Sequence, residues 1–234
     1  MSIGILGGTF NPIHIGHTLP AQSVATSLAL DKVVLLPANI PPHKEMPTIS
    51  AQHRANMVKL ACKDSAIFDC DTRELNRDGH SYTVDTLKEL NAVYPKQTLY
   101  FIMGMDSLLT FTTWHNYQEI LTFCHIVVTT RPGHPFDDTF NHSFDDTLKK
   151  SSKVSLETAA LLSQHRVKTI QACKDKKSGC IIFSQDLNGE DSPLLDISST
   201  EIRSLLKKDP TSLECSRFMH KNVLAYIQKN QLYL

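Results

Sequence analysis

The chain has 234 residues, 41% of them hydrophobic, which is enough to bury a substantial core in one domain of ordinary to large size. Lysine plus arginine balance aspartate plus glutamate at 24 each, and this excludes a global charge that would attract nucleic acid or anionic membrane. The first residues lack the pattern of a secretory signal, and no run approaches the roughly 18 apolar residues of a membrane span. We therefore expect a cytoplasmic protein with neither nucleic acid nor membrane as a partner.

The cysteines indicate a reducing compartment and no metal site of the protein's own. Six are scattered along the chain, without a CxxC pair, at positions 62, 70, 124, 173, 180 and 215. In a chain of this length they read as reduced thiols and not as a disulfide framework. Neither HExxH nor paired CxxC motifs occur, so no protein metal ligands are predicted.

Short apolar runs alternate with longer segments of helical periodicity. In chain order, the predicted elements are a strand at 2–6, a helix at about 16–30, a strand at 32–38, a helix at 50–63, a strand at 66–72, a helix at 83–93, a strand at 98–103, a helix at 106–121, a strand at 125–130, a strand at 180–184, and helices at about 200–208 and 215–230. Residues 134–179 are polar and charged, with a modest helical pattern around 156–167.

This alternation predicts an α/β fold, a Rossmann-like, doubly wound parallel sheet with helices on both faces. Residues 1–234 are expected to form a single domain, with 134–179 as a polar surface elaboration. Ligands of such sheets bind beyond the carboxyl ends of the strands, where the strand order reverses. The unusual loops of this sequence fall at such ends, after Leu6, Ala38 and Met103.

The first motif is GGTFNPIHIGH, residues 7–17, directly after the first predicted strand. Its two leading glycines permit a tight turn and a close approach of backbone to a ligand. His14 and His17 lie three residues apart at the predicted start of a helix, where imidazoles and backbone N–H groups together suit an anion. Read in isolation, the same residues would be a turn followed by histidines that cap or pack a helix.

The second motif is ISSTEIR, residues 197–203, near the carboxyl end. Ser198, Ser199 and Thr200 open a predicted helix and offer hydroxyls and N–H groups to phosphate oxygens. Arg203 is placed to reach the same anion with paired donors. Taken alone, this would be an ordinary capping sequence with a surface arginine.

Three further segments follow other predicted strands or open a helix. NIPPHK at 39–44 is a stiff loop with His43 and Lys44, which could hold a second phosphate. Ser81-Tyr82-Thr83 precedes a helix, and Gly104-Met105-Asp106-Ser107 leads to Trp114, the only tryptophan. Individually they read as a proline turn, a helix cap and a core aromatic.

The first two motifs resemble those of the HIGH nucleotidyltransferase superfamily, and all five segments together resemble nicotinate-nucleotide adenylyltransferase over almost the whole chain. Residues 134–179 are the least similar part. By this resemblance, the residues that stabilise charge on the triphosphate are His14, His17 and Arg203. The residues implied at the ATP site are Gly7, Gly8, Thr9, Phe10, Gly104, Asp106, Ser198, Ser199 and Thr200. Those implied at the nicotinate mononucleotide are Asn39, His43, Lys44, Tyr82, Thr83, Trp114 and Arg131.

The resemblance implies particular contacts for some of these residues. Trp114 stacks on the pyridine ring, the Tyr82-Thr83 backbone takes the nicotinate carboxylate, and Asp106 contacts a ribose. Lys44 stands where some relatives carry arginine, which keeps the charge but loses the bidentate geometry.

The implied reaction is adenylyl transfer in NAD biosynthesis. The phosphate of nicotinate mononucleotide attacks the α-phosphorus of ATP in line, and pyrophosphate leaves. A phosphate nucleophile is already ionised, so positioning and charge neutralisation are the protein's task. Mg²⁺ is expected as the cofactor, held by ATP oxygens and water because the sequence shows no carboxylate cluster. The partners are the two substrates, and a homo-oligomer is left open.

Three alternatives compete with this assignment. A class I aminoacyl-tRNA synthetase shares the HIGH element, but this chain is far shorter and lacks a KMSKS run. A non-catalytic nucleotide sensor would be expected to have lost His17 or Arg203. An adenylyltransferase for phosphopantetheine is the nearest competitor among enzymes, and the Trp114 segment argues against it.

Overall fold

A six-stranded, fully parallel sheet with strand order β3-β2-β1-β4-β5-β6 organises the protein. The computed structural model describes residues 1–39, 49–77, 79–129, 154–187, 197–209 and 213–233. The strands are β1 (Ser2–Gly8), β2 (Lys32–Pro37), β3 (Phe68–Cys70), β4 (Thr98–Gly104), β5 (His125–Thr129) and β6 (Ile181–Phe183). The order reverses between β1 and β4, as in a doubly wound Rossmann-type sheet, so the predicted fold class is confirmed.

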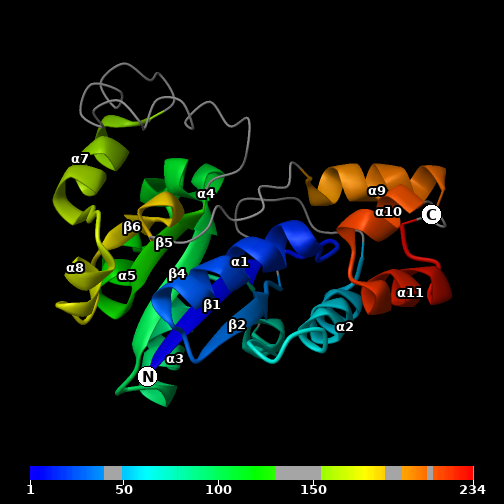
Figure 1. The fold of residues 1–234 in the computed structure, drawn as a ribbon, viewed down its shortest axis with the longest axis horizontal. Helices are drawn as coiled ribbons and strands as arrows, with labels where there is room; N and C mark the ends of the chain where they lie inside the picture. The colour runs from blue at the N-terminus through cyan, green and yellow to red at the C-terminus, as the bar shows by residue number, and fades with distance from the viewer. Residues whose placement is uncertain (40–48, 78, 130–153, 188–196, 210–212, 234) are drawn as a thin grey trace.

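The described helices pack on both faces of the sheet (Figure 1). They are α1 (Ile15–Leu28), α2 (Ala51–Cys62), α3 (Thr83–Val93), α4 (Met105–Leu109), α5 (Tyr117–Phe123), α7 (Leu156–His165), α8 (Ile170–Lys174), α9 (Ser199–Lys208), α10 (Leu213–Phe218) and α11 (Lys221–Lys229). Short 3-10 turns cover Arg73–Asn76, Phe111–Thr113 and Ser184–Asp186. Figure 1 shows α9, α10 and α11 near α2 at one edge of the sheet, with α7 and α8 at the other.

Alternation along the strands divides the core into two clusters. In β2, Val33 and Leu35 belong to one cluster while Val34 and Leu36 belong to the other. The first cluster collects apolar side chains of α1, α2, α9, α10 and α11, and the second those of α3, α4, α5 and α7. All four β2 side chains are at most 2% exposed, which explains why this strand reads as a continuous apolar run.

Two predicted helices are wrong in their continuity. The segment predicted at 106–121 consists of α4, a 3-10 turn and α5, with Trp114 and Asn116 at the break. Asn116 has φ 48°, a left-handed conformation that asparagine tolerates better than most residues. The segment predicted at 215–230 is divided into α10 and α11, and α11 is preceded by His220 in an extended conformation.

The described part of the 134–179 segment contains α7 and α8. Leu161 and Leu162 of α7 and Cys173 of α8 are buried against the sheet. The assignment of the whole segment as a surface elaboration of a single domain stays a prediction. Within the described ranges, no helix combines the length and apolar character needed to cross a membrane.

Candidate active site

A cavity of about 390 Å³ opens at the carboxyl edge of the sheet, around the ends of β1 and β2. This is the position expected for a ligand of a doubly wound sheet. Seven of the predicted site residues line it: Gly7, Gly8, Thr9, Tyr82, Thr83, Asp106 and Trp114. The cavity therefore brings together residues from three separate sequence segments.

His14 and His17 lie beside this cavity at the start of α1, and they do not line it. His14 is the N-cap of α1, fully buried, and its Nδ1 accepts the backbone N–H of Gly16 at 3.1 Å. The Nδ1 of His17 accepts the N–H of His14 at 3.3 Å, and the two rings have centroids 3.8 Å apart. A neutral ring in either position then carries its proton on Nε2, which suits a phosphate oxygen as acceptor.

Gly16 makes this close pair of tilted rings possible. A Cβ at this position would lie 2.9 Å from the His14 ring and 3.0 Å from Ile197. The motif His14-Ile15-Gly16-His17 therefore meets a steric requirement as well as supplying two donors. Gly16 has room for a hydrogen atom only in place of a side chain.

The loop between β1 and α1 turns through Phe10, which has φ 48°. Its side chain is 2% exposed and meets the His17 ring edge-on, with centroids 5.2 Å apart. The Phe10 ring therefore packs against the His17 ring and supports it. Positive φ in a buried non-glycine residue is typical of loops that the surrounding structure holds in place at functional sites.

Helix α9 is hydrogen-bonded directly to this loop. Arg203 Nη1 donates to the carbonyl of Asn11 at 2.9 Å, and its Nη2 donates to Thr200 Oγ1 at 3.0 Å. Ser199 Oγ donates to the carbonyl of Pro12 at 3.0 Å. Residues about 190 positions apart in the sequence therefore form one surface next to the cavity.

Ser198 acts as a helix cap in this structure. Its Oγ accepts the N–H of Glu201 at 3.2 Å, while the Glu201 carboxylate accepts the N–H of Ser198 at 2.7 Å. This capping box takes two of the four N–H groups that open α9. The N–H groups of Ser199 and Thr200 are the two that it does not use.

Tyr82, Thr83 and Trp114 all line the cavity. Tyr82 is the N-cap of α3 and lines the cavity with Thr83, and among the described residues its side chain accepts no hydrogen bond from the first N–H groups of this helix. Trp114 is half-buried and is held by Phe101 and Phe111, with ring centroids at 6.1 and 5.5 Å. An aromatic ring beside a helix N-terminus suits a flat, anionic ligand.

Of the remaining predicted residues, three lie near the cavity and three lie outside the described ranges. Asp106 is exposed at the start of α4, and Gly104 precedes it at the end of β4. Asn39 donates from its backbone N–H to Ser81 Oγ at 3.0 Å and from Nδ2 to the Arg77 carbonyl at 3.1 Å. His43, Lys44 and Arg131 lie outside the described residues.

Several polar residues around the cavity were missed by the sequence analysis. Arg54 is 1% exposed and bonds to carbonyls at the ends of β1 and β2. Glu74 lines the cavity and accepts a hydrogen bond from Thr86 at 2.7 Å, and burial raises the pKa of its carboxyl group. Tyr233 donates to Asn11 Oδ1 at 2.7 Å from the carboxyl end of the chain. Their partners are distant in sequence, so only the fold reveals these contacts.

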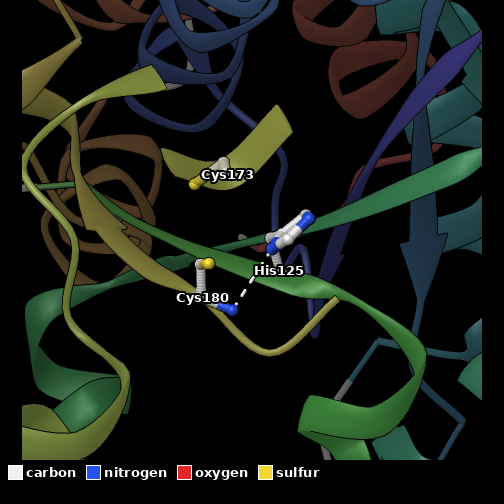
Figure 2. Close-up of side chains that lie close together, drawn as sticks. All are labelled: His125, Cys173 and Cys180. Carbon is white, nitrogen blue, oxygen red and sulfur yellow. Dashed lines mark hydrogen bonds between the residues drawn. The ribbon is translucent and has the colours of Figure 1, made fainter. Parts of the chain in front are cut away.

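His125, Cys173 and Cys180 form a buried group whose ligand atoms lie within 4.8 Å of one another (Figure 2). His125 begins β5, so the group lies at the amino end of the sheet, opposite the cavity. The His125 Nδ1 accepts the Cys180 N–H at 3.2 Å, and its Nε2 donates to the Lys176 carbonyl at 3.2 Å. Burial also raises the pKa of the Cys173 thiol to about 12. Both ring nitrogens thus bond to backbone groups, and these bonds hold His125 of β5 against the 176–180 segment that leads from α8 to β6.

Comparison with known proteins identifies the family to which this chain belongs. A sequence model of the cytidylyltransferase-like family matches residues 5–205. A probable nicotinate-nucleotide adenylyltransferase from Shewanella putrefaciens is 41% identical over 238 residues, covering all of both chains. A protein of the same name from Psychromonas ingrahamii is 37% identical, covering 99% of this chain and 97% of its own length.

Solved structures agree at the level of the fold. The nicotinic acid mononucleotide adenylyltransferase of Plasmodium falciparum, solved with NaAD, superimposes with a TM-score of 0.67 at 19% identity, covering 99% of this chain and 97% of that one. A putative nicotinate-nucleotide adenylyltransferase from Vibrio parahaemolyticus gives 0.59 at 16% identity, covering 100% and 96%. The resemblance found in the sequence is confirmed by the full-length relatives, and this chain belongs to the nicotinate-nucleotide adenylyltransferase family.

Proposed function

We propose that this protein joins the AMP unit of ATP to nicotinate mononucleotide, giving nicotinate adenine dinucleotide and pyrophosphate in NAD biosynthesis. The observation that carries the proposal is the contact of Arg203 with the Asn11 carbonyl, which sets α9 beside the histidine pair of α1. The contact between α9 and the β1–α1 loop lies next to a cavity that is lined by the Trp114 ring and by the first residues of α3. One side therefore suits a triphosphate, and the other suits a flat ring with a carboxylate.

At the triphosphate side, His14, His17 and Arg203 are proposed to neutralise charge on the leaving pyrophosphate. Each of the two histidine rings is held through Nδ1, so that Nε2 is the donor. Donors fixed in advance stabilise developing charge without reorganising during the reaction. The N–H groups of Ser199 and Thr200 add to this site at the start of α9.

At the cavity side, Trp114 is proposed to stack on the pyridine ring, and the Thr83 end of α3 to bind the carboxylate. The attacking phosphate is ionised at neutral pH, so alignment with the α-phosphorus is what the protein must provide. Asp106, exposed at the cavity, is proposed to contact a ribose hydroxyl. His43, Lys44 and Arg131 keep their proposed place near the mononucleotide.

Magnesium is proposed to enter with ATP, as part of that substrate. Among the described residues, the one group able to offer three metal ligands is the His125 group at the opposite end of the sheet. Phosphate oxygens and water are common Mg²⁺ ligands in such sites. A cytoplasmic location is also proposed, and the oligomeric state is left open for measurement by light scattering.

The test is a pyrophosphate-release assay with purified protein, MgATP and one acceptor at a time. The acceptors are nicotinate mononucleotide, nicotinamide mononucleotide and phosphopantetheine, with water as the blank. We expect the highest kcat/KM with nicotinate mononucleotide. Turnover with phosphopantetheine alone, or with no acceptor of the three, would overturn the proposal.

A further inference from the structure

Arg54 is a fully buried arginine outside the motifs that define the family. It lies on α2, is 1% exposed, and makes hydrogen bonds to backbone carbonyls only. Within the described ranges no acidic side chain forms an ion pair with it. Arginine is almost never fully buried without a specific reason, because its charge must leave water.

The three carbonyls that Arg54 binds belong to two different loops. Its Nη1 donates to Thr9 at 2.8 Å and to Ala38 at 2.6 Å, and its Nη2 donates to Asn39 at 3.1 Å. Thr9 follows β1 and Ala38 follows β2, and both residues line the cavity. One guanidinium therefore fixes the distance between the proposed ATP loop and the first residue of the 39–44 loop.

The same contact continues toward the nicotinate end. Asn39, whose carbonyl Arg54 holds, donates its own N–H to Ser81 Oγ at 3.0 Å. Ser81 directly precedes Tyr82 and Thr83, the residues proposed to bind the carboxylate. Arg54 thus joins Thr9 to Asn39, and the hydrogen bond from Asn39 to Ser81 extends this connection to the residue before α3.

The chemistry of the guanidinium suits this task. Burial lowers the pKa of the Arg54 guanidinium, although an arginine side chain stays charged in proteins. Its planar, forked donors can serve several carbonyls at fixed angles, which a lysine ammonium on a flexible stem cannot reproduce. Removing it would leave three carbonyls at the cavity edge without this donor.

We propose that Arg54 is a positioning residue. It holds the proposed ATP loop after β1 and the start of the proposed nicotinate-nucleotide loop after β2 at the separation that in-line transfer requires. The inference rests on the proposed function for the identity of the two substrates. It assigns Arg54 no contact with either of them. Its effect passes through the backbone of Thr9, Ala38 and Asn39.

The experiment compares Arg54→Met and Arg54→Lys with Arg166→Met. Arg166 is the matched control, since its side chain is 8% exposed, pairs with Asp186 at 3.5 Å and does not line the cavity. Each variant is measured for kcat, for KM of ATP and of nicotinate mononucleotide, and for thermal unfolding, at a temperature well below every midpoint. The concentration of folded active sites is measured for each variant, and kcat is expressed per active site.

We expect Arg54→Met to raise both KM values and to lower kcat/KM on the order of 100-fold, because small misplacement of reacting groups is costly. Arg54→Lys should retain the charge and lose roughly tenfold, with both KM values again raised. Arg166→Met should lose stability but keep kcat/KM within about twofold. If Arg54→Met does not fold, Arg54→Lys alone decides.

A merely structural arginine gives a different pattern. Either Arg54 variant would then show unchanged KM values and an unchanged kcat per active site, with only the midpoint of thermal unfolding lowered, and that result overturns the proposal. Failure of the proposed function is visible separately. The wild type would then turn over a different acceptor, and the same KM comparison would be run with that compound.

Discussion

Two fully buried histidines lie at opposite ends of the sheet, and they do different work. His14 follows β1 at the carboxyl edge, where it caps α1 and its ring contacts the His17 ring. His125 begins β5 at the amino edge, where both of its ring nitrogens bond to backbone groups of Cys180 and Lys176. Both are 0% exposed, so burial alone does not separate a functional histidine from a structural one.

The difference follows from the surroundings of each ring. At the carboxyl edge, His14 lies with a helix N-terminus, a second imidazole and Arg203 of helix α9, all of which favour an anion. At the amino edge, burial lowers the pKa of His125, which keeps its ring neutral. Changes at the carboxyl edge should therefore alter turnover or substrate binding, whereas changes at the amino edge should alter stability.

The largest expected effect is that of His17→Ala. Removing one fixed donor to developing charge typically lowers kcat by about 10²–10³-fold. The variant also loses the bond from the His14 N–H, so the free energy of unfolding should fall by about 0.5–2 kcal/mol. Stopped-flow or steady-state pyrophosphate release measures the first effect, and a thermal melt the second. His17→Gln, which keeps a terminal N–H donor, should recover part of kcat; near-normal turnover of His17→Ala would contradict the assignment.

Next in size is the preference for acid over amide. The N–H groups that open α3 favour an acceptor-only carboxylate, whereas the NH₂ of a carboxamide opposes one of them. Hydrogen bonds to a charged group contribute roughly 1.5–3 kcal/mol and the helix terminus about 0.3–1 kcal/mol. The expected preference for nicotinate over nicotinamide mononucleotide is therefore roughly 10- to 1000-fold in kcat/KM at saturating ATP. Equal values would remove the carboxylate from the Tyr82-Thr83 end and leave adenylyl transfer intact.

Trp114→Ala should have a smaller and more selective effect. Stacking on an aromatic side chain contributes roughly 1–3 kcal/mol per base, or about 5- to 150-fold in Kd for the nicotinate nucleotide. ATP affinity should change little. Because Trp114 also packs on Phe101 and Phe111, calorimetric titration is accompanied by a thermal melt and by Trp114→Phe, which keeps a ring. Parallel losses for both nucleotides would make Trp114 a core residue only.

The sequence predicted the sheet and the helices α3 and α9 well because these elements depend on local pattern. Helix α3 was predicted at 83–93 and observed at Thr83–Val93, and α9 was predicted to within one residue at its start. The predicted helix at 106–121 failed because apolar periodicity continues across the break at Trp114. The left-handed Asn116 next to it carries no periodicity signal.

Around the cavity, by contrast, the sequence analysis missed polar residues whose partners are distant along the chain. Arg54 sits on an amphipathic-looking helix, where an arginine ordinarily faces solvent, and its acceptors are backbone atoms 15 to 45 residues away. Glu74 and Tyr233 have the same character, since their partners are set by the tertiary fold. Residue type and spacing therefore predicted the groups proposed to touch substrate, and not the groups that hold those in place.

The smallest effect on catalysis is expected at the amino edge, with His125→Asn. The amide oxygen can accept from the Cys180 N–H in place of Nδ1, but the bond to the Lys176 carbonyl is lost. We expect kcat/KM within about twofold of wild type, and a free energy of unfolding lower by about 1–3 kcal/mol at pH 7.5. A large loss of kcat in well-folded protein would end the distinction between the two edges.

The pH dependence sharpens this last prediction. The pKa of His125 in the folded protein lies below its ordinary value of 6.5, because burial penalises the charged ring. As the pH falls through about 6.5, the unfolded chain takes up a proton that the folded chain does not, so stability is present above this pH and is lost below it. His125→Asn lacks this titration. Denaturant unfolding at pH 7.5 and 5.5 should therefore show the gap between wild type and variant narrowing in acid, and a gap that widens would mean that His125 is charged in the folded state.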